Sequence, residues 1–122
     1  MKKKMTKEQY KLVKPIDLNP SQHLFAGTSA SWFVEESYLC AATQYPHLRL
    51  VCRAIKQMNM YKPSNVGDIL VYSGKCTFGT TSISVEMTVT RQQDNEIIAQ
   101  GIVVFVNIDE KGNSQPHHLS SQ

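Results

Sequence analysis

The chain lacks any apolar run near the length of about 20 residues that a membrane-spanning helix needs. It also lacks the apolar segment of a signal peptide. Met1-Lys2-Lys3-Lys4 resembles the basic start of one, but polar residues follow it. We therefore expect no membrane partner. With 122 residues, of which 41% are hydrophobic, the chain is long enough for one globular domain with a single core.

Cysteine is sparse and scattered. Cys40, Cys52 and Cys76 are odd in number, lie far apart and form no Cys-x-x-Cys pair. This pattern excludes a disulfide framework. The four histidines show no ligand spacing either, so we expect no metal site. Three reduced thiols that behave as small hydrophobic side chains predict a cytoplasmic protein.

Basic charge is scarce outside the N-terminus. Six lysines precede Pro15 against a single acid there, whereas the remainder carries seven basic and nine acidic residues and a net charge of about −2. A nucleic-acid-binding protein would carry basic charge across a folded face, so we expect no nucleic acid partner. The sequence predicts a disordered basic N-terminus over residues 1–8, one domain over 9–115 and a polar tail over 116–122.

One long buried helix is predicted after a turn-rich loop over residues 16–27. Residues 28–44 are apolar around most of the helix circumference, which is typical of a buried helix, and Tyr45-Pro46 ends the pattern. Thr28 and two nearby serines offer oxygens that could cap its start.

Strands are predicted for most of the rest of the chain, one of them short and four of them long: 10–14, 48–61, 69–78, 82–90 and 97–108. Residues 82–90 alternate polar and apolar throughout, which indicates a strand with one face in water. A single helix cannot cover both faces of strands this long. We therefore expect an α+β domain in which a long antiparallel sheet curves around one helix and a second copy protects the exposed parts.

Five stretches of the sequence, in the right order, resemble the hot-dog-fold acyl-CoA thioesterases: DLNPSQHLFAG, WFVEES, QMNMYKP with VGDI, FGTTSISVEMTV and VVFVNIDEKGNSQP. The resemblance covers roughly residues 10–117. It implies the hot-dog fold and hydrolysis of acyl-CoA to free CoA and a carboxylic acid, without a metal or redox cofactor. It also implies active sites at the interface of a homodimer, with assembly into tetramers or hexamers.

The resemblance assigns roles to the loop before the helix. In the family, the backbone amide at the second loop glycine polarises the thioester carbonyl, and here that residue is Gly27, between Ala26 and Thr28. Asn19 matches the loop asparagine that positions water and substrate. Taken without the resemblance, Gly27 is equally an ordinary turn glycine, and Asn19 is a turn residue before Pro20. Two further loop glycines of the family are replaced, by Gln22 and Ala26.

The water-activating acid is where this sequence departs from the family. The family places Asp or Glu seven residues after the second glycine, but this chain has Val34 there, followed by Glu35 and Glu36. Three interpretations stay open. The helix starts one residue later, with Thr28 in the role of the glycine; Glu35 reaches the site from its shifted position; or the site has lost its base. A surface position suits Glu36 better than Glu35.

Further residues are candidates for substrate contacts. Thr81 and Ser82 match a strand entry that lies beside bound CoA in the family, although a hairpin turn explains them equally well. Arg53, with Lys56, is a candidate for contacts with the CoA phosphates. His23 belongs to no motif of the related dehydratases, which pair a histidine with an acid, so that class is disfavoured.

Two functional hypotheses result. The first is an acyl-CoA thioesterase in which Asn19, Gly27 and Glu35 are catalytic and Ala26, Thr28, Arg53, Thr81 and Ser82 bind substrate. The second is a catalytically degenerate hot-dog protein that binds acyl-CoA or a related thioester without hydrolysing it, which Val34 favours.

Overall fold

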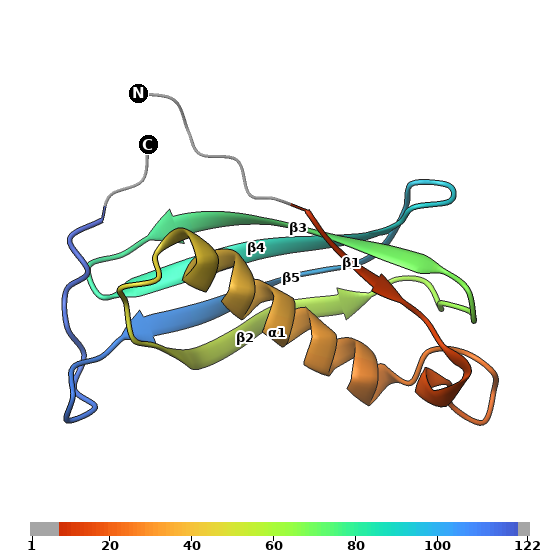
Figure 1. Cartoon of the computed structure of the whole chain (residues 1–122), viewed down its shortest axis with the longest axis horizontal. Helices are drawn as coiled ribbons and strands as arrows, with labels where there is room; N and C mark the ends of the chain where they lie inside the picture. The colour runs from red at the N-terminus through yellow and green to blue at the C-terminus, as the bar shows by residue number, and fades with distance from the viewer. Residues whose placement is uncertain (1–7, 120–122) are drawn as a thin grey trace.

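A five-stranded antiparallel sheet wraps around a single long helix in the computed structural model, which describes residues 8–119 (Figure 1). The strands lie in the order β1-β3-β4-β5-β2, so β1 and β2 form the two edges of the sheet. The elements are β1 (Gln9–Leu12), a short 3-10 turn (Pro15–Asp17), α1 (Ala26–Gln44), β2 (Leu50–Met60), β3 (Ile69–Phe78), β4 (Ser82–Arg91) and β5 (Glu96–Asn107).

These elements confirm the predicted helix and strands. Each of the four long strands agrees with its predicted range within two residues at either end, and α1 begins two residues before the predicted start. The predicted polar tail differs, because His117 is buried and its Nε2–H donates to the Ser82 carbonyl at 2.9 Å. The predicted disorder of the N-terminus lies outside the described residues, except for Glu8.

The core lies between α1 and the concave face of the sheet. On the sheet side, the inward residues of β4 are all buried and apolar, while the alternating residues face outward: Ile83, Val85, Met87 and Val89 form the inward set. From α1, Phe33, Cys40 and Ala41 pack against them as part of one cluster. Burial of this face fixes the orientation of the helix and therefore the position of its first turn.

A bulge near the end of β2 allows the sheet to curve toward the first half of α1. The register with β5 shifts between Lys56 and Asn59, and Gln57 adopts a positive φ of 52°. Gly101 of β5 lies directly beneath the bulge. A Cβ atom there would lie 2.9 Å from the Met58 Cα and 3.1 Å from the Phe33 Cζ, so only glycine fits without a backbone shift.

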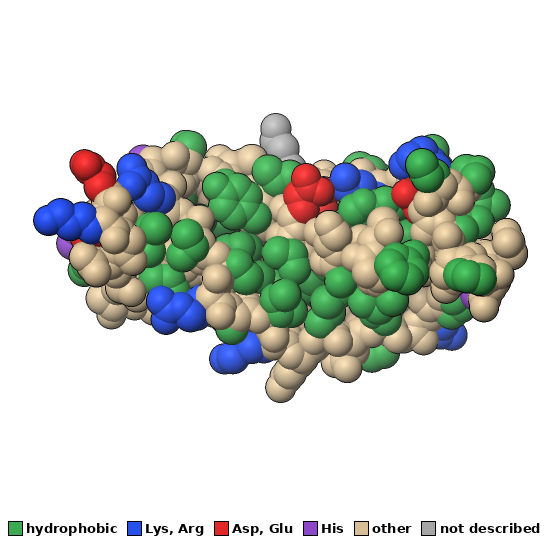
Figure 2. All heavy atoms as spheres, turned by 90° about the horizontal axis from the view of Figure 1, so that it is seen from below, with side chains coloured by type: hydrophobic (Ala, Val, Ile, Leu, Met, Phe, Trp, Pro, Cys, Tyr) green, Lys and Arg blue, Asp and Glu red, His purple; other side chains and the backbone are tan. Residues whose placement is uncertain are grey.

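The β2 edge is long, apolar and unpaired on its outer side within the described residues. It runs for 11 residues, and Val51, Ile55 and Met60 are among its exposed side chains. Figure 2 shows apolar side chains gathered on the face of the molecule where α1 and β2 lie. An exposed apolar edge of this kind is a surface onto which another strand can pair.

Candidate functional site

The first turn of α1 exposes backbone amides that the helix itself cannot satisfy. Phe25 occupies the N-cap position without a side-chain capping bond, and the first intrahelical bond runs from the Ser29 amide to the Phe25 carbonyl at 2.9 Å. The amides of Ala26, Gly27 and Thr28 therefore have no acceptor within the helix. The first turn also contains no acidic residue, so the positive end of the helix dipole is free to favour a partial negative charge.

A cavity of about 240 Å³, which we call the helix-tip cavity, opens beside this first turn. Its walls come from the helix start, the end of β2 with the following loop, and β5. The lining residues are Leu24, Ala26, Ser29, Met60, Tyr61, Lys62, Pro63, Ser64 and Ile98. Of the predicted site residues, Ala26 lines it and Gly27 follows it in the same turn, so a small group in the cavity lies next to the helix amides.

Two contacts fix the helix tip to the loop after β2. The Leu24 amide donates to the Ser64 carbonyl at 2.7 Å, and His23 Nδ1 lies 2.8 Å from the Asn65 Oδ1. Leu24 and His23 precede α1 by only a few positions. The contacts between the two loops therefore hold the helix tip against the sheet. The sequence showed Ser64 only as one residue of a turn, and a lone turn serine carries no signal of burial.

Asn19 stabilises the loop that leads into the helix. Its Oδ1 accepts hydrogen bonds from the amides of Ser21 at 2.9 Å and His23 at 3.1 Å, and its own amide donates to the His23 carbonyl at 2.7 Å. These are the contacts of a turn residue, the simpler of its two interpretations. A catalytic role for Asn19 stays a prediction.

The two adjacent acids of α1 have opposite environments. The Glu35 side chain is 58% exposed, whereas that of Glu36 is 5% exposed, and Lys11 Nζ lies 3.8 Å from one and 3.7 Å from the other. The preference for a surface position at Glu36 is therefore wrong, since residue 36 lies one turn from Phe33 and Cys40 on the face turned to the sheet. Its Oε1 is buried and has no hydrogen-bond partner within residues 8–119.

The helix start places both candidates for the glycine role in the first turn. Because α1 begins at Ala26, two residues before the predicted start, Gly27 and Thr28 both have amides without an acceptor within the helix, and the three interpretations of the acid stay predictions. Val34 is partly buried against the core, and Glu35 pairs with Lys11 of β1, at the sheet edge opposite β2. Glu35 lines neither the helix-tip cavity nor the second cavity described below.

Burial raises the pKa of Glu36 above its ordinary value of 4.5, and Lys11 only partly opposes this effect. The folded carboxyl therefore ionises at higher pH than the unfolded one. The stability linked to this group is complete below pH 4.5 and is lost as the pH rises through the folded pKa.

We expect Glu36→Gln to raise the Tm at pH 8 by about 3–6 °C, the shift that about 1 kcal/mol produces in a domain of this size. The gain should shrink as the pH falls, toward zero well below pH 4.5, where the carboxyl is neutral in both states. Thermal unfolding of both proteins across this pH range measures the difference. A gain that grew toward acid pH would contradict the assignment.

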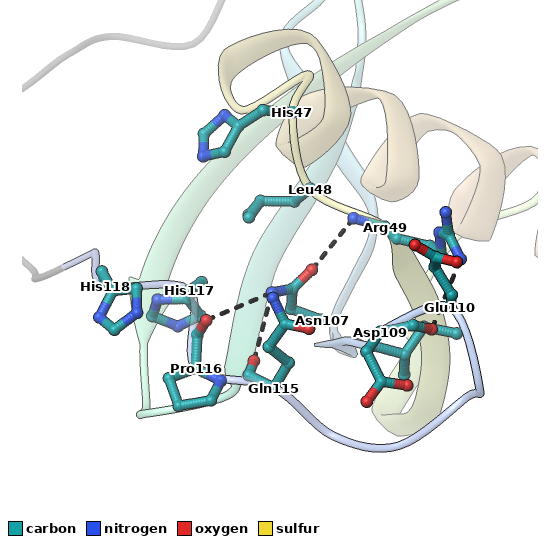
Figure 3. A pocket seen from close by; sticks show the side chains of 11 residues that line it. His47, Leu48, Arg49, Asn107, Asp109, Glu110, Gln115, Pro116, His117 and His118 are labelled. Atoms are coloured by element: carbon teal, nitrogen blue, oxygen red, sulfur yellow. Dashed lines mark hydrogen bonds between the residues drawn. The ribbon is translucent and has the colours of Figure 1, made fainter.

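A second cavity, which we call the tail cavity, lies where the C-terminal segment crosses the end of the sheet (Figure 3). It has a volume of about 380 Å³ and a polar lining that includes His47, Arg49, Asn107 and His118. The Asn107 Oδ1 accepts from the Arg49 amide at 3.0 Å, and its Nδ2 donates to the Gln115 carbonyl at 3.2 Å. The first bond ties the start of β2 to the end of β5, and the second ties the C-terminal segment to the same place.

The predicted CoA-binding residues Thr81 and Ser82 lie at the tail-cavity end. The Asn107 amide donates to the Thr81 carbonyl at 2.8 Å, and His117 bonds the Ser82 carbonyl. The rings of Tyr45 and Phe78 pack edge to face there, 5.5 Å apart, next to the C-terminus of α1. With 19 residues α1 is about 28 Å long, so one protomer does not bring this end to the helix tip.

Arg53 lies between these two ends. It is exposed in the middle of β2, at the irregularity between Cys52 and Ala54. Within residues 8–119, no three His, Cys, Asp or Glu side chains gather closely enough to hold a metal ion. In the same part of the chain, no helix combines the length and apolar character needed to cross a membrane.

The comparison with known proteins finds no matching family model. A curated relative from Haemophilus influenzae, described as an uncharacterized acyl-CoA thioester hydrolase, is 26% identical over 115 residues, which cover 85% of this chain and 72% of the relative. The chain and this relative are therefore similar over most of both sequences.

Solved structures extend the likeness to the backbone. An acyl-CoA hydrolase from Staphylococcus aureus, in complex with butyryl-CoA, CoA and CoA disulfide, matches with a TM-score of 0.81 and 23% identity over 91% of this chain and 68% of that one. A hexameric broad-specificity acyl-CoA thioesterase matches with a TM-score of 0.78 and 26% identity, over 95% and 83%. A hexameric thioesterase from Yersinia pestis matches with a TM-score of 0.74 and 21% identity, over 93% of each chain. The predicted α+β hot-dog fold is thus confirmed, and the chain is similar in sequence and in backbone to the acyl-CoA thioester hydrolases of that fold.

Proposed function

We propose that this protein is an acyl-CoA thioesterase that hydrolyses acyl-CoA to free CoA and a carboxylic acid. The observation that carries the proposal is the uncapped start of α1, which opens on the helix-tip cavity and has no acid in its first turn. Similarity to acyl-CoA thioester hydrolases along most of the chain supports it. Water and protein groups supply all the chemistry that the reaction requires, so the proposal includes no metal or redox cofactor.

In the proposed mechanism, water attacks the thioester carbonyl carbon and the carbonyl oxygen gains negative charge. The Gly27 amide donates to that oxygen, a contribution worth about 3–4 kcal/mol of barrier for a single preorganised donor. The C–S bond then breaks, the hydroxyl of the water stays on the acyl carbon, and the proton removed from the water passes to the CoA sulfur. Asn19 keeps the loop before α1 in place.

The carboxylate that removes this proton has to be reachable by water. Of the two carboxylates on α1, Glu36 is enclosed and only Glu35 is exposed. We assign the role of general base to Glu35. Because Glu35 lines neither cavity of its own protomer, the assignment requires that the groove it serves is formed with a second copy.

The β2 edge supplies a way to bring the two substrate-binding ends of neighbouring copies together, whereas Glu35 lies at the opposite, β1 edge of the sheet. Antiparallel pairing of two β2 strands about a two-fold axis places the Met60 end of one strand beside the Leu50 end of the other. The helix-tip cavity lies next to Met60, and Arg49 in the lining of the tail cavity precedes Leu50. The helix tip of one protomer then faces the Thr81–Ser82 end of its partner.

In this arrangement the two ends of the substrate have different surroundings. The thioester lies at Ala26, Gly27 and Thr28, and the CoA moiety extends toward the partner's Thr81 and Ser82. Arg53 supplies positive charge for the CoA phosphates. The homodimer formed through β2 joins the two substrate-binding ends, and hexamers among the similar structures support the further assembly into tetramers or hexamers that would bring Glu35 of another copy to the site.

A second candidate function has a specific observation in its favour. Val34, at the position where the family has its acid, is partly buried and apolar. A protein without a working base would bind acyl-CoA or a related thioester without hydrolysing it. Stabilisation by acyl-CoA in a thermal shift assay, without thiol release, distinguishes this function from the first.

The proposed substrate, an acyl-CoA, indicates the metabolic role of the reaction, and the cysteine content indicates its compartment. We place the reaction in cytoplasmic lipid metabolism, which the few and scattered cysteines of the sequence support, since they offer no disulfide framework. The proposal includes no nucleic acid or membrane partner.

The proposal is tested by measuring thiol release from acyl-CoAs of two to sixteen carbons together with the molar mass in solution. We expect Ile55→Lys to shift the protein toward monomer and to abolish most of its activity, because the variant places a charge in the paired edge. Val66 is equally exposed, at 52% for both residues, and lies in the loop after β2, so Val66→Lys is the matched control. A monomeric wild-type protein with full activity would contradict a shared site.

A further inference from the structure

The turn between β3 and β4 is held in place through its carbonyl groups. His117, in the C-terminal segment, makes two of the bonds: its amide donates to the Thr80 carbonyl at 3.2 Å, and its Nε2–H donates to the Ser82 carbonyl at 2.9 Å. The Asn107 amide donates to the Thr81 carbonyl at 2.8 Å. Three successive carbonyls of the turn are therefore occupied, two of them by one residue of the tail.

The amides of the same turn have no such partners. Among residues 8–119, neither the Thr80 amide nor the Thr81 amide donates a hydrogen bond. Thr80 is exposed and Thr81 is partly exposed, so a ligand in solution reaches the turn. Successive backbone amides without an acceptor are a common way for proteins to bind phosphate and other anions.

His117 is suited to hold the turn because its own position is fixed. The residue is 5% exposed, and its ring packs edge to face against Phe78 with the ring centroids 5.7 Å apart. Its Nδ1 accepts from the Leu119 amide at 2.9 Å, so the proton of the neutral ring lies on Nε2, the atom that donates to Ser82. Both ring nitrogens are therefore in use.

We propose that His117 is a positioning residue for CoA. It holds the carbonyls of Thr80 and Ser82, so that the Thr80 and Thr81 amides stay available to the nucleotide phosphates of CoA. This inference rests on the proposed function, which places the CoA moiety beside Thr81 and Ser82, and it gives the C-terminal segment a part in binding. The thioester lies at the helix tip of the other protomer, so His117 affects the recognition of CoA and not the chemical step.

The test compares ligands with and without the nucleotide. The dissociation constants of the thioether analogues S-butyl-CoA and S-butyl-pantetheine are measured by calorimetry. His117→Phe keeps an aromatic ring but removes the donor to Ser82. We expect it to weaken S-butyl-CoA about tenfold, the effect of one hydrogen bond, and to leave S-butyl-pantetheine unchanged.

Two further variants of histidine serve as controls. His117→Gln places an amide N–H donor where the ring had one, and it should restore most of the preference for S-butyl-CoA. His47 is exposed, lines the tail cavity and bonds none of the three carbonyls, so His47→Phe is the matched change and should bind both analogues as the wild type does.

Steady-state kinetics provide a second reading. For butyryl-CoA, His117→Phe should raise KM about tenfold with kcat nearly unchanged, whereas for butyryl-pantetheine both constants should match the wild type. Both substrates are measured on the same preparation, so a smaller folded fraction lowers both rates alike and does not imitate this difference. Thr81→Pro, which removes one of the two amides directly, should raise the KM for butyryl-CoA in the same way.

Binding separates this inference from the proposed function, because it requires no turnover. If no acyl-CoA is hydrolysed but His117→Phe weakens only S-butyl-CoA, the inference holds without the thioesterase. If hydrolysis is confirmed but His117→Phe leaves both analogues unchanged or weakens both equally, His117 has a structural role alone and the inference is wrong. A wild-type protein that binds S-butyl-pantetheine as tightly as S-butyl-CoA would also overturn it.

Discussion

Gly27→Pro is expected to lower kcat for acyl-CoA hydrolysis by about 10²–10³-fold, the usual cost of losing one preorganised donor to the developing oxyanion. Proline has no backbone N–H, so the substitution removes the donor assigned to the thioester oxygen. It is tolerated in the first turn of a helix, because the lost amide has no intrahelical acceptor there. Steady-state thiol release and the Tm of the variant give the two required readings.

Gly27→Ala is the matched control for this prediction. It adds a side chain at the same place but keeps the N–H. The new Cβ would meet the Phe25 Cε2 at 2.6 Å, the far end of a half-exposed ring that can rotate away. The alanine variant should therefore keep most of its activity. An active Gly27→Pro protein would exclude the Gly27 amide from the mechanism.

Glu35→Gln is expected to lower kcat by about 10²–10⁴-fold, the range that a positioned general base contributes. Glutamine has nearly the same shape but cannot take a proton from water. The variant also loses the pairing with Lys11 at 3.8 Å, which costs little stability because Glu35 is more than half exposed. Thiol release at saturating substrate, with thermal unfolding as a check on folding, measures the effect.

Glu36→Gln makes the same chemical change one residue further along and should keep its activity, since Glu36 is enclosed between α1 and the sheet. Unchanged turnover in Glu35→Gln would remove Glu35 from the mechanism. The variant Val34→Asp then distinguishes a thioesterase from a protein that only binds thioesters. If hydrolysis appears only in that variant, the natural protein binds thioesters without cleaving them.

The fold could be predicted from the sequence because its main signals are local. The alternation over residues 82–90 follows directly from one buried face and one wet face of β4. The apolar pattern of residues 28–44 predicted the helix but overstated its burial, because α1 buries one face and leaves Glu35 and Tyr38 exposed. The bulge at Gln57 could not be predicted, since its cause is the close approach of Gly101 on another strand.

The candidate site was only partly accessible to sequence reasoning. Gly27 at the helix tip followed from the loop motif and the helix start. The burial of Glu36 and the exposure of Glu35 could not be predicted. Neighbouring helix positions differ in direction by about 100°, and only the packed sheet shows which face of the helix is buried. Ser64 was hidden for a similar reason, as its burial depends on the Leu24 contact across two loops.

The most direct measurement of a shared site mixes two inactive variants. Gly27→Pro and Glu35→Gln are prepared separately, then unfolded and refolded together in equal amounts, and thiol release is compared with each variant refolded alone. If the helix tip of one protomer works with the carboxylate of its partner, half of the dimers are mixed and each has one intact site. The mixture should then show about a quarter of the wild-type activity. Activity that stays at the level of the separate variants would show that both groups act within one protomer or not at all, and would contradict the shared groove.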